Sequence, residues 1–258
     1  MTGVDVLRHA DAAALAEAVA ARLVATLVDR IESAGQAHLC LTGGGIGTAV
    51  LRAVAASQAR DSIDWRHVDV WWGDERYLPE GSADRNETGA RAALLSHVPV
   101  SEARVHPIPG PWGSNSDVDQ AAAAYAEELA RAARPEDHAP VPAMDVLLLG
   151  IGPDGHVASL FPGQPALHDE RAVTAVRGAP KPPPTRISLT FPTLNAARET
   201  WLLASGAEKA SAVRLALTDS AGAFQVPAAG VRGRERTLML VDEAAAAKLP
   251  ATLGRPGA

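Results

Sequence analysis

Residues 144–156 read MDVLLLGIGPDGH: a strand-like run over 144–149, with Asp145 as its one polar residue, is followed at once by a glycine-rich segment that ends at His156. A short apolar run that stops at a turn signal is typical of a buried strand, and strands buried on both faces are typical of parallel sheets. Ligands collect at the carboxyl ends of the strands in such sheets. The stretch therefore indicates an α/β fold and marks the segment after Leu149 as a candidate site.

Outward from this stretch, short β-branched or apolar runs alternate with longer alanine-rich runs. The runs predicted as strands are 4–8, 38–41, 68–72, 105–108, 144–149, 172–176, 186–189, 201–204 and 237–240. The runs predicted as helices are 12–33, 46–56, 86–96, 118–134 and 207–217. This alternation predicts an α/β, Rossmann-like three-layer sandwich, with a mostly parallel sheet and helices on both faces. No segment is typical of a linker, so residues 1–258 are expected to form a single domain.

The composition restricts the class of partner. The chain has 258 residues, a formal net charge of −6 and no run of Lys and Arg. Nucleic-acid backbones need a basic surface, so no nucleic-acid partner is expected, whereas a small phosphate needs only a few well-placed cations. Residues 1–8 carry no signal-peptide pattern, and no apolar run approaches the roughly 18 residues of a membrane span. We expect a cytoplasmic protein without membrane contact, present as a monomer or small homo-oligomer.

The cysteine and histidine usage argues against a metal centre. Cys40 is the single cysteine, so the chain has no intrachain disulfide and no Cys-rich metal site. It lies in an apolar run and is interpreted as buried. The histidines show no metal-ligand spacing, and no G-x-S-x-G nucleophile pattern occurs. We therefore expect no metal, no cofactor and no serine nucleophile of the α/β-hydrolase type.

The first of the candidate loops, residues 42–48, joins a predicted strand to a predicted helix. Its consecutive glycines, Gly43, Gly44 and Gly45, let the backbone approach a ligand and expose amides at a helix N-terminus, where an anion is favoured. The dinucleotide fingerprint is not met, because Thr48 stands where Gly or Ala is required, and no P-loop Lys follows. We expect a phosphate or sugar contact here; the alternative is a tight turn without a ligand.

The second loop, residues 72–79, concentrates charge directly after an apolar strand. Arg76 is a candidate clamp for a phosphate or carboxylate group. Asp74 is a candidate to orient a catalytic base or to bind a sugar hydroxyl. The alternative is a structural cluster of salt bridges. Downstream, Asn86 is predicted to cap the next helix; the alternative is that its side chain reaches back into the site.

The third loop contains the candidate catalytic pair, Asp154 and His156. A histidine at the carboxyl end of a strand, with an aspartate nearby to orient it, suits a general base. The glycines of this loop also match the letters of the dinucleotide fingerprint. Pro162, however, comes too soon for the long helix that a pyrophosphate site needs. We interpret His156 as functional rather than structural.

The fourth loop, residues 205–210, places Lys209 in the first turn of a predicted helix. A cation there opposes the preference of the helix dipole. A bound anion would account for it, and a solvent-exposed lysine is the alternative.

Five segments in order along the chain resemble the glucosamine-6-phosphate isomerase/6-phosphogluconolactonase family: 41–45, 73–79, 150–162, 181–190 and 205–210. The combination of Gly-Asp-Glu-Arg at 73–76 with Asp-Gly-His at 154–156 is specific, whereas either block alone is weaker. The resemblance runs nearly from end to end and implies a sugar-phosphate substrate.

The family contains an isomerase branch and a lactonase branch. The isomerase branch carries an acidic residue five positions after the histidine, where this chain has Phe161. Arg76 and the segment 181–186 also resemble the lactonase branch, which makes Arg186 a candidate phosphate ligand. Gly45 stands where many relatives have Ser, so only its backbone is expected to bind.

The resemblance implies hydrolysis of 6-phospho-D-glucono-1,5-lactone to 6-phospho-D-gluconate in the oxidative pentose phosphate pathway. His156 then activates water, and either Asp154 or Asp74 orients its ring. Arg76 is shared between the phosphate and the reacting end. The other phosphate-binding candidates are Gly43, Gly44, Gly45, Arg186 and Lys209. One alternative is an amino-sugar-phosphate deaminase or isomerase, which Phe161 opposes. The other is a non-catalytic sugar-phosphate sensor.

Overall fold

A computed structural model describes residues 3–112, 117–137, 139–218 and 221–257 of the chain. Its centre is a seven-stranded sheet in which every pair of neighbouring strands is parallel. The strands in spatial order are β10 (Arg255–Pro256), β1 (Val4–His9), β9 (Arg236–Asp242), β8 (Glu199–Ala204), β5 (Val146–Gly150), β2 (Ala37–Leu41) and β3 (Val68–Trp72). The predicted fold class, an α/β sandwich with a mostly parallel sheet, is confirmed.

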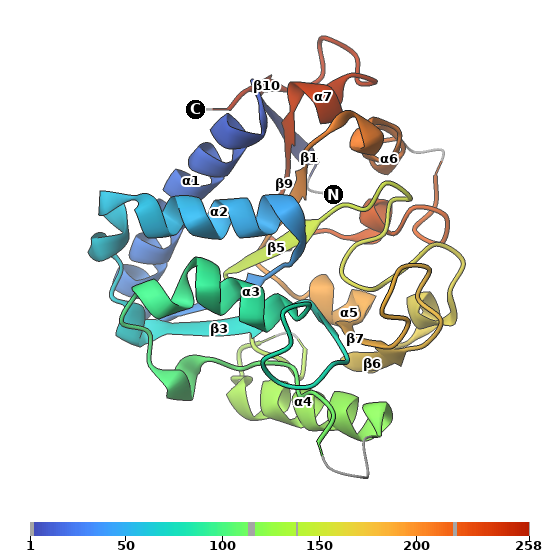
Figure 1. Cartoon of the computed structure of the whole chain (residues 1–258). Helices are drawn as coiled ribbons and strands as arrows, with labels where there is room; N and C mark the ends of the chain where they lie inside the picture. Colours follow the sequence, from blue (N-terminus) through green and yellow to red (C-terminus); the bar gives the residue numbers. More distant parts are fainter. Residues whose placement is uncertain (1–2, 113–116, 138, 219–220, 258) are drawn as a thin grey trace.

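The helices lie on both faces of this sheet. They are α1 (Ala12–Ala34), α2 (Gly44–Ala56), α3 (Asn86–Ala93), α4 (Val118–Ala132), α5 (Phe191–Leu194), α6 (Ala210–Ala216) and α7 (Glu243–Ala246). Connections from β1 to β2 to β3 run one way along the sheet, and those from β3 to β5, β8 and β9 run back. Because such crossovers are right-handed, α1 and α2 cover one face while α4 and α6 belong to the other. Figure 1 shows α1, α2 and α3 side by side in one layer.

The longest helix, α1, shows why the spacing of apolar residues in the sequence predicted a helix. The Asp11 carboxylate accepts a hydrogen bond from the Ala14 N–H (2.9 Å), which caps the helix at its start. Leucines and valines four apart face the sheet and are fully buried: Leu15, Val19, Leu23 and Leu27. The helix ends at Gly35, whose φ of 78° is the left-handed conformation that glycine adopts without strain.

Three further strands form a separate antiparallel sheet, which the sequence analysis did not predict. They are β4 (Asp74–Arg76), β7 (Arg186–Leu189) and β6 (Val173–Val176), in that order. Gly73 joins the two sheets, because its N–H donates to the Leu41 carbonyl (3.1 Å) and its carbonyl accepts from the Leu189 N–H (2.9 Å). The small sheet is therefore joined to the central sheet at the carboxyl end of β3, and α4 packs against the small sheet.

Some predicted boundaries differ from the structure. The predicted strand at 105–108 makes only an isolated bridge between Val105 and Val70, because prolines interrupt the segment that follows. The predicted helix at 86–96 ends at Ala93, and the one at 207–217 begins as a 3₁₀ turn. The 3₁₀ turns are Gln58–Ser62, Trp65–His67, Leu95–His97, Glu102–Arg104, Pro165–His168, Ala207–Lys209 and Pro227–Gly230.

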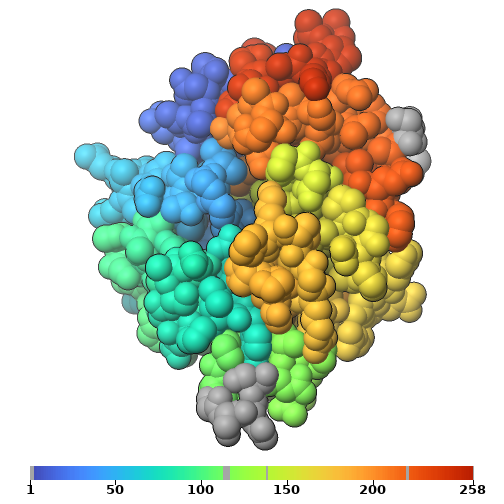
Figure 2. Space-filling model, turned by 45° about the vertical axis from the view of Figure 1, so that its right-hand side comes forward, coloured from blue at the N-terminus to red at the C-terminus, as the bar shows by residue number. Residues whose placement is uncertain are grey.

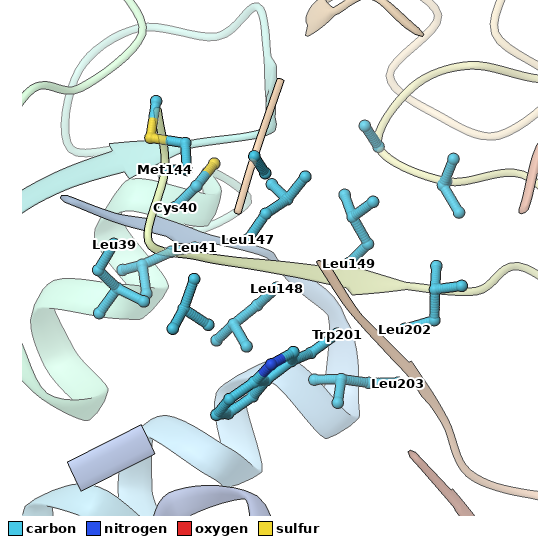
Figure 3. Close-up of a cluster of buried hydrophobic side chains, with 14 of the residues drawn as sticks. Leu39, Cys40, Leu41, Met144, Leu147, Leu148, Leu149, Trp201, Leu202 and Leu203 are labelled. Atoms are coloured by element: carbon cyan, nitrogen blue, oxygen red, sulfur yellow. The ribbon is translucent and has the colours of Figure 1, made fainter. Parts of the chain in front are cut away.

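The core is continuous around the central strands. Figure 3 shows leucines of β2 and β5 packed against Trp201 and its neighbours on β8. Cys40 is fully buried among them, as predicted. In the described part of the chain, no helix is both long and apolar enough to cross a membrane.

The strand order has one consequence for the site. β2 and β5 are neighbours, but the chain leaves β2 toward α2 on one face and leaves β5 toward the opposite face. Such a switch point opens a crevice at the carboxyl ends of the two strands. The two glycine-rich loops, 42–48 and 150–156, start at this point, and the Gly150 N–H donates to Thr42 Oγ1 (3.2 Å). The topology therefore brings together two loops that lie about a hundred residues apart.

Candidate active site

A cavity of about 520 Å³ opens at this switch point. All four candidate loops contribute to its lining, together with the segment that precedes β7. In Figure 2 the amber segment near residue 180 stands between the teal segment near residue 80 and the yellow-green segment near residue 155. The predicted residues that line the cavity are Gly43, Gly44, Gly45, Asp74, Arg76, Asn86, His156, Phe161, Arg186 and Lys209.

Among the described residues, the His156 ring has a hydrogen-bond partner at only one of its two nitrogens. Its Nδ1 lies 2.5 Å from Asp154 Oδ1, and the same oxygen accepts the backbone N–H of His156 (3.3 Å). The Nε2 atom makes no hydrogen bond with any residue in the described part of the chain, and 17% of the side chain is exposed. An acceptor on Nδ1 favours the tautomer with its proton there, which leaves the Nε2 lone pair available. This arrangement suits a general base.

The charge on Asp154 supports the same arrangement. Burial alone would raise the pKa of this carboxyl group, but its hydrogen bond with His156 and the charge of His156 lower the pKa to about 2. Asp154 is therefore an anion at neutral pH. An anionic partner both orients the imidazole ring and stabilises the imidazolium form that appears when the ring takes up a proton.

The loop needs glycine at two positions to place this pair. A Cβ atom at Gly152 would overlap the His156 ring and the Asp154 carboxylate. Gly155 has a φ of 85°, and a Cβ atom there would overlap Val226. The Gly152 N–H then donates to the His156 carbonyl (2.9 Å), which closes the loop on itself. The glycines therefore serve the His–Asp geometry, and no dinucleotide helix follows them.

Asp74 does not contact His156. Its Oδ2 accepts a hydrogen bond from Ser159 Oγ (2.6 Å), and Asn86 Nδ2 donates to its backbone carbonyl (2.9 Å) and, at 3.4 Å, to its Oδ1. Between the two aspartates that the sequence left open, the structure brings only Asp154 to the imidazole. Asp74 lines another wall of the cavity.

Asn86 does not cap α3, and the alternative prediction, that its side chain reaches back into the site, is confirmed. Arg85 is the N-cap residue, and the Asn86 side chain turns toward Asp74 and Gly43 instead. A Cβ atom at Gly43 would overlap the Asn86 amide, so glycine is required there for close packing. Gly43 is in turn the N-cap of α2, without a side-chain hydrogen bond, so the first amides of that helix face the cavity region.

Glu75, the third residue of the Gly-Asp-Glu-Arg block, has a structural role. Its carboxylate accepts the backbone N–H groups of Arg76 (2.8 Å), Asn86 (2.7 Å) and Glu87 (2.8 Å). Burial raises the pKa of Glu75, although these donors and Arg85 act in the opposite direction. Its position at the N-terminus of α3 ties β4 to that helix.

Two arginines stand opposite each other across the small sheet. Arg76 on β4 pairs in register with Arg186 on β7. Like charges directly opposite each other destabilise a strand pair, and an anion in the cavity would offset that repulsion. Arg76 Nε is buried and has no hydrogen-bond partner among the described residues, while its Nη1 donates to the Asp84 carbonyl (2.5 Å). The wall formed by the two side chains is therefore positive.

Lys209 enters the cavity from the loop after β8. Asp242, at the end of β9, positions that loop by accepting hydrogen bonds from Ser205 Oγ (2.6 Å) and the Gly206 N–H (3.1 Å). Burial and the nearby charge of Lys181 lower the pKa of Lys209, while Glu208 and Asp154 act in the opposite direction. An anion beside Lys209 would favour its charged form.

Phe161 contacts both the candidate histidine and Arg186. Its ring centre is 4.6 Å from that of His156, and the Arg186 guanidinium carbon lies 5.9 Å from the same ring centre. The side chain is 1% exposed and packs with Val176 and Ala179. An apolar ring at this position supplies no second proton-transfer group next to His156.

Sequence reasoning missed two residues of the cavity region. Lys181 lines the cavity from a proline-rich segment in which the sequence singled out only Arg186 as a ligand. Ser159 bonds Asp74 from a position 85 residues away, and no local pattern signals such a contact. In the described ranges, no group of three or more His, Cys, Asp or Glu side chains is arranged to hold a metal ion.

Comparisons with known proteins agree with this geometry. The family model described as glucosamine-6-phosphate isomerases/6-phosphogluconolactonase matches residues 10–240. A 6-phosphogluconolactonase of Streptomyces coelicolor is 57% identical over 96% of this chain and 95% of that protein. One from Mycobacterium tuberculosis is 49% identical over 93% of this chain and 96% of that protein.

Solved structures show the same fold. The 6-phosphogluconolactonase of Trypanosoma brucei has a TM-score of 0.84 at 26% identity, covering 97% of this chain and 100% of that one. A monomeric glucosamine-6-phosphate deaminase has a TM-score of 0.76 at 20% identity, covering 95% and 100%, which shows the shared fold alone. The chain belongs to the glucosamine-6-phosphate isomerase/6-phosphogluconolactonase family.

Proposed function

We propose that this chain hydrolyses 6-phospho-D-glucono-1,5-lactone to 6-phospho-D-gluconate, the lactonase step of the oxidative pentose phosphate pathway. The observation that carries the proposal is the His156 ring, held at Nδ1 by Asp154 with Nε2 free, in a cavity that also contains several cations. The names of the relatives that are most similar over nearly the whole chain support the same substrate.

In the proposed reaction, His156 Nε2 takes a proton from water as the water oxygen bonds to the lactone carbonyl carbon. The tetrahedral intermediate then breaks the bond between that carbon and the ring oxygen. The imidazolium returns its proton to the departing ring oxygen, which becomes the C5 hydroxyl group. One residue thus serves as base and then as acid, and Asp154 stabilises the charge between the two steps.

The positive groups divide between two ends of the substrate. Lys209 and the amides of Gly43, Gly44 and Gly45 are proposed to hold the phosphate, with Arg186 adding positive charge on the opposite wall. Arg76 is shared with the reacting end, where developing negative charge on the carbonyl oxygen needs a donor. Asp74, which has no contact with His156, is proposed to bind a sugar hydroxyl.

Holding the phosphate matters because a lactone also hydrolyses without a catalyst. Fixing the substrate by its remote end places the carbonyl carbon against one water and one base. The wider proposal includes a cytoplasmic location, no nucleic-acid or membrane partner, no metal or cofactor, and a single domain that works as a monomer or small homo-oligomer.

The decisive experiment measures acid release from freshly prepared 6-phospho-D-glucono-1,5-lactone in an indicator assay, with the spontaneous rate subtracted. We expect a rate that is proportional to protein concentration. A rate equal to the protein-free blank would overturn the proposal. Binding of 6-phosphogluconate without turnover would instead indicate a sensor.

The isomerase branch is the second chemistry on this fold. Phe161 opposes it, because the residue five positions after His156 lies against the imidazole ring and carries no acid. Release of ammonia from glucosamine 6-phosphate, measured with the same protein sample, would overturn the lactonase assignment.

A further inference from the structure

The loop between β6 and β7, residues 177–185, is held by one buried side chain. Arg186 Nε donates to the Pro183 carbonyl (3.1 Å), and Arg186 Nη2 donates to the carbonyls of Lys181 (3.0 Å) and Pro182 (3.1 Å). Arg186 is 6% exposed, so these hydrogen bonds form largely out of contact with water. The rigid fork of a guanidinium group suits this fixed set of acceptors.

The contacts of Arg186 limit what else it can bind. Two of its three nitrogens are used on the loop, and the Phe161 ring lies beside the guanidinium carbon. Only Nη1 has no hydrogen bond within the described ranges. A side chain that presented its fork to a phosphate would leave these donors free for the ligand. The geometry of Arg186 is that of a residue which holds a loop.

The held loop presents Lys181 to the cavity. Lys181 lines the cavity together with Lys209, and neither ammonium group forms an ion pair with an acidic residue in the described part of the chain. Lys181 approaches Lys209 closely enough for its charge to lower the pKa of Lys209. Two unpaired cations that line one cavity repel each other, and an anion bound by both would offset that repulsion.

We propose that Lys181 is a second cationic ligand of the substrate's phosphate group, opposite Lys209, and that Arg186 is a positioning residue that holds Lys181 in place through the loop carbonyls. This inference rests on the proposed function and adds the residue that makes the site selective for phosphorylated lactones.

The test compares two substrates, 6-phosphoglucono-1,5-lactone and glucono-1,5-lactone, which lacks the phosphate. Lys181→Ala should raise KM for the phosphorylated lactone about tenfold, the effect of losing one charge-assisted contact. The kcat/KM for glucono-1,5-lactone should stay within about twofold of wild type. Lys248→Ala is the matched control, because Lys248 is exposed and donates to Ser211 Oγ (2.7 Å) away from the cavity. An unchanged KM in Lys181→Ala would overturn the role of Lys181.

The positioning role of Arg186 is tested by combining substitutions. Arg186→Lys keeps the charge but loses the fork, so it should raise KM for the phosphorylated lactone as Lys181→Ala does. In the Lys181→Ala background, Arg186→Lys should add less than about twofold, because it acts through a residue that is already absent. Multiplied effects in the double variant would show that Arg186 binds the phosphate itself.

A separate measurement distinguishes this inference from the proposed reaction. Calorimetric binding of 6-phosphogluconate depends on the phosphate and not on turnover. If the wild-type protein failed to hydrolyse the lactone but bound 6-phosphogluconate, weaker binding by Lys181→Ala would still support the phosphate ligand. Equal affinity of the two proteins would overturn it.

Discussion

Two histidine–carboxylate clusters lie at different places in this molecule. At the carboxyl ends of β2 and β5, His156 has one ring nitrogen on Asp154 and the other open to a cavity. Beside the edge strand β3, His106 has both nitrogens occupied: Nε2 lies 3.1 Å from Asp69 Oδ1, and Nδ1 lies 2.7 Å from Glu128 Oε1.

The surroundings of His106 complete the contrast. Its ring stacks on Trp71 with centres 3.9 Å apart and planes 8° from parallel. Burial alone would lower its pKa, but hydrogen bonds with Asp69 and Glu128 and their charges raise it to about 9. His106 is therefore a cation at neutral pH that links β3 to α4. A histidine with two carboxylates has no lone pair to offer, whereas a histidine with one carboxylate and an open nitrogen can act as a base.

Among substitutions in the two clusters, the largest expected effect is the loss of catalysis on removing His156. His156→Ala should lower kcat about 10²–10⁴-fold, the usual contribution of a general base. The urea midpoint should change little, because the ring is partly exposed and its removal leaves the loop hydrogen bonds in place. Near-normal turnover by a folded His156→Ala protein would show that another group activates the water.

Asp154→Asn should lower kcat by less than His156→Ala does, because the ring remains but loses its anionic partner. The exposed pair Asp64 and His67, with 3.0 Å between Oδ2 and Nδ1, offers a matched control. Asp64→Asn removes a similar carboxylate from a histidine outside the cavity, and kcat should be unchanged. Equal losses in the two variants would contradict a special role for Asp154.

His106→Ala should show the opposite pattern. We expect a loss of about 1–3 kcal/mol in the free energy of unfolding, because the buried Asp69 and the half-buried Glu128 lose their donor, with kcat/KM within about twofold of wild type. Urea unfolding measures the first quantity and the lactone assay the second. His67→Ala, at an exposed site, should cost no more than about 0.5 kcal/mol.

A smaller expected effect is a pH dependence of the unfolding free energy that comes from His106. Because the pKa of His106 is raised to about 9 from its ordinary 6.5, its stabilising contribution is complete below pH 6.5 and is lost as the pH rises through about 9. Asp69 and Glu128 bond the two ring nitrogens, and Arg104 pairs with Asp69 beside them. The unfolding free energy of wild type should therefore fall toward that of His106→Ala between pH 7 and 10. Parallel curves for the two proteins would refute the assignment.

Much of the fold was readable from local pattern. Apolar residues four apart identified α1, and short apolar runs identified the strands of the central sheet, because burial on one or two faces leaves a periodic trace. The antiparallel sheet was not readable. Strands β4 and β7 pair across more than a hundred residues, and their short sequences carry no sign of a partner.

The candidate site divides in the same way. Asp154 and His156 are two residues apart, so the chain sequence itself brings them into contact, and the glycines around them were a visible sign of a tight loop. The choice of Asp154 over Asp74 as the orienting group required the structure, because Asp74 reaches Ser159 only after the chain has folded.

The sequence by itself determined the alternation of strands and helices, the four loops and the candidate histidine, since each depends on residues that are neighbours along the chain. Only the tertiary structure decided which histidine keeps an open ring nitrogen and which has both nitrogens bonded, and that Arg186 bonds the loop carrying Lys181. These roles depend on which nitrogens are already bonded, and the partners come from distant segments. A hydrogen bond or a charge acts over a few ångströms in space, so its partner is settled by how the chain folds.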